Sequence, residues 1–414
     1  MANALSFEQV LLLKILSSCV NKDAKINGGD FKNVSADSWC KIFLESKEHA
    51  VDLLVYDKIC EIKEYVDERE FLELKKSISP SVKNNAKVSY GQSEIVKLLE
   101  KNGFSYIIIK GASSSSYYDK PSLRLLGDVD ILINKEDTEK IAKVLIENGY
   151  NQTQNDHPSH VGFEKKGVTY ELHFEVAGIP YGKVGEKLRA YLKENAFRET
   201  LEKNDGLSNF NAPSDFTFGI ILILHTVHHM LGEGLGLRHF LDFATFVSKT
   251  KEQPFWTKEL LPLLKDIGLL VFTLSMVKTA CAYLGVDTPS WCDKVCDEIE
   301  DEIILDVLSS GNFGRKDLDR ASSGMLISEH GKDGTKNSAT YNLSHSLHVA
   351  VLRMPIVKKC IILYPFVYLY KSIKFLFLSL IGKRPSVIKM KNQAKERKII
   401  YDKLKVFQTE NGEK

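Results

Sequence analysis

The chain of 414 residues has few cysteines, almost no net charge and no basic leader ahead of its first apolar run. Its seven cysteines lack the spacing of a metal site, because Cys292 and Cys296 lie one helical turn apart but no second pair accompanies them. A net charge of +2 provides no overall field that would recruit nucleic acid or a membrane surface. Glu8 precedes the apolar run Val10 to Leu16, which is more typical of a core helix than of a signal peptide. We therefore expect a reduced, cytoplasmic protein.

The composition is that of a globular protein, with 43% hydrophobic and 27% charged residues, and two or three domains are expected at this length. Helical spacing of apolar residues predicts a helical region over residues 1–100. Mixed strand and helix patterns predict a small α/β unit, the candidate catalytic core, over 101–200. Helices are predicted again over 201–308 and 343–414, and the stretch 309–342, rich in glycine, serine, aspartate and lysine, is predicted to be a loop.

The most informative segment is Gly127-Asp128-Val129-Asp130, which lies between two apolar stretches. Aspartates at positions i and i+2 of a strand project from the same face, because side chains alternate along a strand. Carboxylates held this close repel each other unless a cation lies between them. Ligation by aspartate oxygens suits Mg²⁺, which commonly shares carboxylates with substrate phosphates. A solvated strand end is the alternative, so the assignment depends on the neighbouring segments.

A second segment lies upstream of the aspartates. The β-branched and aromatic run Phe104 to Ile109 predicts a buried strand that leads into Lys110, Gly111 and then a run of serines beginning at Ser113. A strand that opens into a turn of small residues before a helix can cradle a phosphate through its backbone N–H groups. Lys110 would add positive charge there. Taken alone, the serine run would favour a flexible loop.

A third segment lies downstream. Residues Val168 to Phe174 alternate in character, so Glu171 and His173 share the face opposite the aromatic and leucine side chains. The lysines and glycine at 165–167 predict a hairpin turn that follows a strand around Phe163. Glu171 is therefore a candidate third carboxylate on a strand next to the aspartate pair.

In this order, the three segments resemble the uncharacterised nucleotidyltransferase family of the polymerase-β-like superfamily. The resemblance is carried by Ile-Lys-Gly-Ala at 109–112, Leu-Arg-x-x-Gly-Asp-Val-Asp-Ile-Leu at 123–132 and Glu-Leu-His-Phe at 171–174. The histidines and arginine at 228–242 are similar to the helical signature of the family, and the resemblance covers roughly residues 35 to 250. It implies an α+β fold, in which a small mixed-sheet nucleotidyltransferase core is surrounded by N-terminal and C-terminal helical regions.

The resemblance also implies a reaction, the metal-dependent transfer of a nucleoside monophosphate from an NTP to an acceptor with release of pyrophosphate. The implied catalytic residues, which would also hold Mg²⁺ or Mn²⁺ in a two-metal arrangement, are Asp128, Asp130 and Glu171. The implied nucleotide-binding residues are Lys110, Gly111, Ser113 and Arg124. Further candidates for substrate contact are His173, His229 and Arg238. The acceptor stays open among a small molecule, a peptide and a sugar phosphate.

One departure from the superfamily pattern motivates an alternative function. Superfamily enzymes typically place Gly-Ser or Gly-Gly shortly before the Asp-x-Asp strand, whereas here Ala112 follows Gly111 and the gap to Asp128 is long. The alternative is a catalytically inactive nucleotide-binding or scaffold module of the same fold. A nucleic-acid polymerase or tRNA-modifying enzyme is disfavoured, because the charge is near neutral and no basic stripe is evident.

The histidines that follow the candidate core raise the question of a second metal. His225 and His229 are four residues apart on a predicted helix and share a face, but a zinc site needs a third ligand, which no sequence signature supplies. Packing, or hydrogen bonding to substrate, is therefore favoured. Arg238 and Asp242 have the same spacing and are predicted to pair with each other, which leaves Arg124 as the cation for the triphosphate.

The C-terminal region contains the apolar runs Cys360 to Tyr370 and Phe375 to Ile381, divided by Lys371 and Lys374. Neither run reaches the ~20 residues of a transmembrane helix. The favoured prediction is a helix packed on the protein body, with lysine stems lying along apolar surface. The alternative is a helix on an anionic membrane surface, since basic residues flank the segment. Residues 360–391 would then be a peripheral membrane contact of a cytoplasmic, membrane-peripheral protein.

Overall fold

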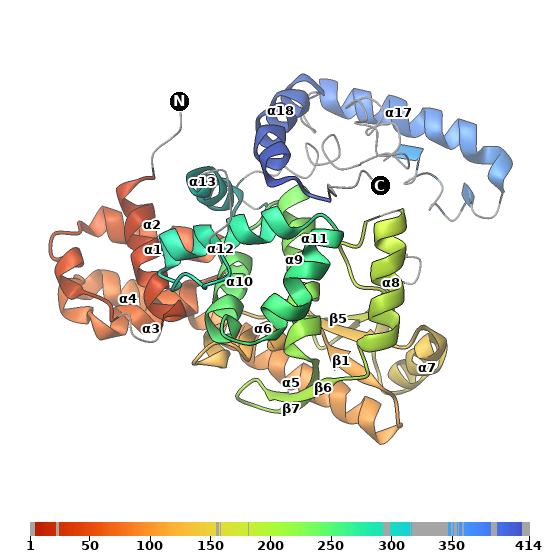
Figure 1. The fold of residues 1–414 in the computed structure, drawn as a ribbon, viewed down its shortest axis with the longest axis horizontal. Helices are drawn as coiled ribbons and strands as arrows, with labels where there is room; N and C mark the ends of the chain where they lie inside the picture. Colours follow the sequence, from red (N-terminus) through yellow and green to blue (C-terminus); the bar gives the residue numbers. More distant parts are fainter. Residues whose placement is uncertain are drawn as a thin grey trace.

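A computed structural model of the chain describes residues 5–21, 25–154, 157, 159–180, 182–292, 299–314, 316, 347–348, 351, 354, 356–357, 360–381 and 387–407. A five-stranded sheet lies beside a large group of helices, and two further helices follow at the C-terminal end (Figure 1). The α+β class expected from the sequence is confirmed. Cys296 and residues 317–342 of the predicted loop lie outside the described residues.

The N-terminal region is helical, as predicted. Its helices are α1 (Phe7–Val20), α2 (Ala36–Glu48), α3 (Asp52–Glu61) and α4 (Glu68–Ser77), with 3₁₀ turns at Gly28–Phe31 and Lys63–Tyr65. The first helix begins at a capping box, because the Ser6 hydroxyl accepts a hydrogen bond from the Gln9 backbone N–H and the Gln9 side chain accepts one from the Ser6 N–H. The buried leucines of α1 join a large apolar core that includes residues of the later helices.

The sheet has the strand order β1-β2-β5-β4-β3. The strands are β1 (Tyr106–Ile108), β2 (Val129–Ile133), β3 (Asn151–Gln154), β4 (His160–Lys165) and β5 (Val168–His173). Only β2 and β5 pair in parallel among these strands, and the other three pairs are antiparallel, so the sheet is mixed. The predicted turn joins β4 to β5, where Lys166 and Gly167 have φ of +53° and +70°, as a tight hairpin turn with both residues in the left-handed region requires.

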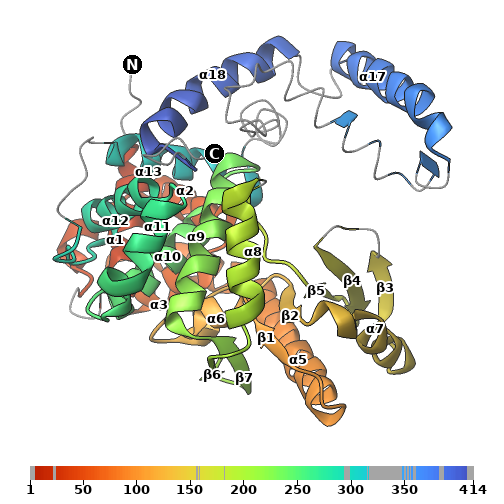
Figure 2. The same cartoon turned by 45° about the vertical axis from the view of Figure 1, so that its right-hand side comes forward.

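The two faces of the sheet have different partners. On β2, Val129, Ile131 and Ile133 belong to a core shared with α5 (Ser79–Lys101) and α7 (Thr138–Glu147), which cover that face (Figure 2). Leu132, which points the other way, belongs instead to the core of the helical region. Because side chains alternate along a strand, Asp130 lies on the same face of β2 as Leu132, which is turned towards the helical region and away from α5 and α7.

The helices after the sheet complete this region. They are α8 (Lys183–Asn195), α9 (Asp215–Leu231), α10 (Leu237–Thr250), α11 (Leu261–Asp266), α12 (Leu270–Leu284) and α13 (Glu300–Ser310), with a π-helical turn at Trp256–Leu260. A separate two-stranded ribbon, β6 (Thr200–Asn204) and β7 (Asn209–Pro213), precedes α9. Ser214 then caps α9 through its hydroxyl, which accepts a hydrogen bond from the Thr217 N–H.

The C-terminal helices are α17 (Tyr364–Leu380), preceded by a 3₁₀ turn at Ile361–Leu363, and α18 (Val387–Leu404). One helix continues through Lys371 and Lys374, so the two apolar runs that these lysines separate in the sequence belong to the same helix. The expected packing on the protein body is wrong for α17: only 6% of its most apolar window is buried, and the helix extends away from the body in Figures 1 and 2. By length and composition alone, Ile361–Ser379 could cross a membrane, with a mean hydropathy of 1.5.

Candidate active site

The predicted carboxylates come together on the sheet face turned towards the helices. Asp128 directly precedes β2, Asp130 lies within it, and Glu171 lies on β5. The parallel pairing sets Asp130 directly beside Glu171 in register. One carboxylate oxygen from each of Asp128, Asp130 and Glu171 lies within 4.8 Å of the others. The strand register therefore positions Asp130 and Glu171, while Asp128 is the residue just before β2.

Two cationic side chains meet at one oxygen of Asp130. The Lys110 Nζ donates to Asp130 Oδ1 at 2.8 Å, and His173 Nε2 lies 2.8 Å from the same oxygen. His173 Nε2 is also 3.1 Å from Glu171 Oε2. Although burial alone would lower the pKa of His173, its contacts with Asp130 and Glu171 raise it above the ordinary value. His173 therefore tends to carry a proton between the two carboxylates.

The pKa values of the two aspartates move in opposite directions. Burial alone would raise the pKa of Asp130, but the charges and hydrogen bonds of Lys110 and His173 lower it well below its usual range. The negative charge of Asp130 and burial raise the pKa of Asp128 to about 6. Within the described residues, the Asp128 side chain is in no ion pair of its own. The cluster thus has more negative charge than its own cations neutralise at Asp128, which fits a site for a divalent cation.

The predicted phosphate turn follows β1. Gly111 has φ of +52°, a left-handed value that favours glycine, and it precedes the short helix α6 (Ala112–Ser115). A Cβ atom built there would lie 3.6 Å from the Asp128 carbonyl, so the turn passes close to the aspartate segment. The Ser113 hydroxyl is buried and donates to the Ile108 carbonyl, which turns it towards β1. Gly111 is therefore next to the acidic cluster, whereas the Ser113 hydroxyl is engaged elsewhere.

The two predicted arginines are buried where the segment before β2 meets α10, the helix that includes Arg238. Arg124 donates to both carboxylate oxygens of Asp242, from Nε at 3.1 Å and from Nη2 at 2.5 Å. Arg238 donates from Nη1 to the Leu125 carbonyl at 3.2 Å. Asp242 has closer partners than the predicted Arg238, because its carboxylate accepts hydrogen bonds from Arg124 and from the Tyr118 hydroxyl. The position of Arg124 beside the helical region, not sequence spacing, decides this pairing.

His160 and His229 are two further histidines to be placed relative to the acidic cluster. His160, which the sequence did not single out, lies opposite His173 in the β4–β5 hairpin, with its Nε2 3.8 Å from Glu171 Oε1. Burial lowers the pKa of His160 to about 4. The predicted turn could have identified this residue, because counting outward from the Lys165–Val168 pair brings His160 opposite His173. The other predicted substrate contact, His229, lies on α9 beside His225 and His239.

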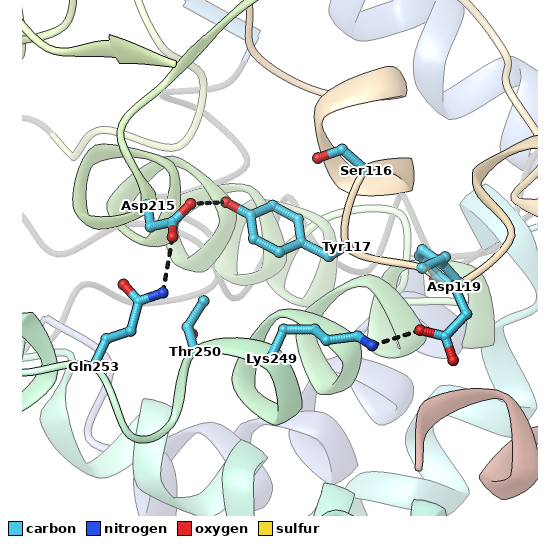
Figure 3. Close-up of a pocket in the computed structure, with 8 residues that line it drawn as sticks. Ser116, Tyr117, Asp119, Asp215, Lys249, Thr250 and Gln253 are labelled. Atoms are coloured by element: carbon cyan, nitrogen blue, oxygen red, sulfur yellow. Dashed lines mark hydrogen bonds and ion pairs between the residues drawn. The ribbon is translucent and has the colours of Figure 1, made fainter. Parts of the chain in front are cut away.

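A separate cavity of about 430 Å³ lies beyond the end of α6 (Figure 3). It is lined by Ser116, Tyr117, Tyr118, Asp119, Asp215, Lys249, Thr250 and Gln253. Asp215 accepts hydrogen bonds from the Tyr117 hydroxyl at 2.6 Å and from Gln253 at 3.0 Å, and Lys249 pairs with Asp119 (Figure 3). None of the residues that line this cavity belongs to the acidic cluster.

Comparison with known proteins agrees with this geometry. The chain matches the family model described as "Uncharacterised nucleotidyltransferase" over residues 35–285. The match includes the turn at Gly111, the three carboxylates and helices α9 and α10. No curated protein and no solved structure matches the chain.

Proposed function

Because the chain belongs to the uncharacterised nucleotidyltransferase family, we propose that it transfers a nucleoside monophosphate from an NTP to an acceptor and releases pyrophosphate. The observation that carries this proposal is the cluster of Asp128, Asp130 and Glu171 beside Lys110 and the Gly111 turn. Nucleotidyl transfer needs charge neutralisation and in-line positioning more than covalent catalysis, and the cluster offers the groups for both.

Each carboxylate of the acidic cluster would have its own role in the reaction. Asp128 and Asp130 would hold Mg²⁺ or Mn²⁺, and Glu171 would complete the ligand set of a two-metal arrangement. Bound there, the ions would neutralise the triphosphate and polarise its α-phosphoryl group. Glu171, half-buried and next to His173, would accept the proton of the acceptor hydroxyl.

The nucleotide would approach from the Lys110 side of the cluster. Lys110 has three N–H donors and uses one of them on Asp130, so it can contact a phosphate without leaving that carboxylate. The backbone at Gly111 would add uncharged donors. Ser113 and Arg124 stay predictions as nucleotide ligands, and each would first have to leave its bond to Ile108 or to Asp242. His173, His229 and Arg238 likewise stay predictions as substrate contacts.

The reaction can be tested without knowing the acceptor. The full chain is incubated with Mg²⁺ and each α-labelled NTP, alone and with small hydroxyl acceptors, peptides and sugar phosphates, and released pyrophosphate and transferred label are measured. We expect both to be lost in Asp128→Asn and Asp130→Asn and retained in Asp137→Asn, which changes an aspartate outside the cluster. Nucleotide binding without pyrophosphate release under every condition would favour the inactive module instead.

For the C-terminal region, we propose peripheral contact of residues 360–391 with an anionic membrane surface. Five exposed large side chains of α17 recur about once per helical turn and form an apolar stripe along one side of the helix: Phe366, Leu369, Tyr370, Ile373 and Phe377. A helix with such a stripe and with lysines beside it is suited to lie at a lipid interface. The flanking residues Lys358, Lys359, Lys383 and Arg384 lie outside the described residues.

Flotation with liposomes tests this contact. We expect the full chain to float with vesicles that contain phosphatidylserine at low salt. A Phe366→Ser/Ile373→Ser double variant should stay in the bottom fraction of the gradient, away from the vesicles. The same change at the exposed Leu72 of α4, outside the stripe, is the control. A wild-type chain that stays unbound at low salt and forms dimers through α17 would show that the stripe covers a second copy instead.

A further inference from the structure

Three histidine rings form a compact group where α9 meets α10. His225 and His229 lie one turn apart on α9, and His239 lies in the first turns of α10. The ring centroids are 4.3 Å apart between His225 and His229, 4.7 Å between His229 and His239, and 5.5 Å between His225 and His239. One ring nitrogen from each histidine lies within 4.8 Å of the other two. The third ligand that the sequence did not reveal is thus supplied by the next helix.

The surroundings of these rings suit metal ligation. His229 and His239 are buried, and the Nδ1 atom of the half-buried His225 has no hydrogen-bond partner among the described residues. An unsatisfied buried ring nitrogen costs free energy that a ligand can recover. Burial lowers the pKa of all three histidines, that of His229 to about 3. The rings therefore stay neutral near pH 7, which is the form that coordinates a metal.

We propose that His225, His229 and His239 bind a transition-metal ion of the zinc type, at a site distinct from the carboxylate cluster. Imidazole nitrogens suit Zn²⁺ and neighbouring transition metals, whereas Mg²⁺ prefers oxygen ligands. Tetrahedral ligation with Zn–N bonds of about 2.0–2.1 Å places ligand nitrogens about 3.3 Å apart. To reach that geometry the side chains would have to rotate, above all the stacked rings of His229 and His239, whose planes are 21° apart. Three protein ligands leave the fourth position open to water or to a ligand group.

Such a site would join two helices next to the proposed reaction centre. Only the segment 232–236 separates α9 from α10, so a bound ion would fix the angle of this helix pair. After burial, the positive charge of Lys110 is among the causes that lower the pKa of His225 and His229, so the two sites are close enough to interact electrostatically. A dication among the histidines would add to the positive potential around Lys110 and strengthen anion binding beside it.

A second group with histidine ligands, His160, Glu171 and His173, has to be separated from this one. In that group His173 is already bonded to Asp130 and Glu171, and one member belongs to the acidic cluster. Metal binding there would respond to Glu171→Gln. Binding at the α9–α10 site would not, because Glu171 offers it no ligand.

Cobalt substitution tests the proposal on the full chain. Protein stripped with a chelator is titrated with Co²⁺, whose visible absorption reports tetrahedral ligation, and with Zn²⁺ followed by elemental analysis. We expect one tightly bound ion per chain in the wild type, in Glu171→Gln and in His228→Gln, which changes an exposed histidine on the same helix. We expect loss of the absorption and at least a tenfold weaker affinity in His225→Gln and in His239→Gln.

Thermal unfolding provides a second measurement should the buried His239→Gln fail to fold. Zn²⁺ should raise the Tm of the wild type and of His228→Gln but raise that of His225→Gln much less, because stabilisation by a ligand falls as its affinity for the folded state falls. Absence of tetrahedral Co²⁺ absorption in the wild type would overturn the proposal. Absorption that is lost in Glu171→Gln and kept in His225→Gln would equally overturn it, since the ion would then lie in the other group.

Discussion

Arg124 and Asp242 form a two-bond ion pair that joins the segment before β2 to helix α10, and both side chains are almost completely buried, at 5% and 2% exposure. Arg124 lies four residues before Asp128, so this pair anchors the chain directly ahead of the acidic cluster. The residue that the sequence suggested as a phosphate ligand thus serves, in this structure, to fasten the sheet to the helical region.

The first prediction concerns this pair. Arg124→Ala leaves a buried carboxylate without its cation, and removing one partner of a buried pair typically destabilises by about 3–5 kcal/mol. Arg189→Ala, which breaks the half-exposed pair with Glu175, should cost below about 1 kcal/mol. Urea unfolding of the two variants measures both values. A stable Arg124→Ala with greatly weakened NTP binding would instead restore Arg124 as a nucleotide ligand.

The second prediction concerns Glu171, which separates an enzyme from an inactive relative. Glu171→Gln keeps the size of the side chain but removes the charge that would accept a proton, so kcat should fall by ~10²-fold or more. NTP binding should weaken much less, because Asp128 and Asp130 keep their charges. Single-turnover kinetics and titration calorimetry measure the two effects, with Glu164→Gln on the exposed part of β4 as control. Full activity would require a different proton acceptor and remove Glu171 from the mechanism.

The third prediction follows from the raised pKa of Asp128. With this pKa at about 6, a proton competes with the metal ion at pH values where an ordinary aspartate is already ionised. The apparent affinity for Mn²⁺ should therefore fall as the pH is lowered through 6, by about tenfold between pH 7 and pH 5. Asp128→Asn should bind Mn²⁺ more weakly and lose most of this dependence. Equal wild-type affinities at both pH values would show that Asp128 is not a ligand.

The fourth prediction concerns His173 as a positioning residue for Asp130. His173→Gln can still donate a hydrogen bond but has no positive charge, so the lowered pKa of Asp130 should rise. Carbon-13 NMR titration of the Asp130 carboxyl should then show a higher pKa than in the wild type, while the circular dichroism spectrum stays unchanged. An unchanged pKa of Asp130 would indicate that His173 only supports the packing of β5.

Local patterns predicted the parts of the fold that local chemistry determines. The β4–β5 hairpin follows from the alternation of Val168 to Phe174 and from the residues at 165–167, of which Lys166 and Gly167 adopt the left-handed conformation of the turn. The polar and largely exposed β6 has no apolar alternation, and it was missed because its pairing with β7 depends on backbone hydrogen bonds rather than on a buried face.

Contacts between distant segments could not be predicted from spacing. The choice of Arg124 over Arg238 as partner of Asp242 depends on packing across 118 residues of chain. His239 joins His225 and His229 only because α10 folds back against α9. The carboxylate cluster could be predicted from the sequence, because the spacing of Asp128 and Asp130 places them on one face and Glu171 follows the same alternation on β5. Only the adjacency of the two strands had to be inferred.

The alternation along β2 has a consequence for how the protein is handled. Val129, Ile131 and Ile133 fill one core, while Asp130 lies on the opposite face of the strand and forms part of the acidic cluster. A slip of one residue against β5 would bury the aspartates among apolar side chains and turn the apolar residues towards the metal ligands. Compact but misaligned protein would therefore have normal helix content and no Mn²⁺ binding. Metal titration, rather than circular dichroism, is the measurement that certifies a refolded sample.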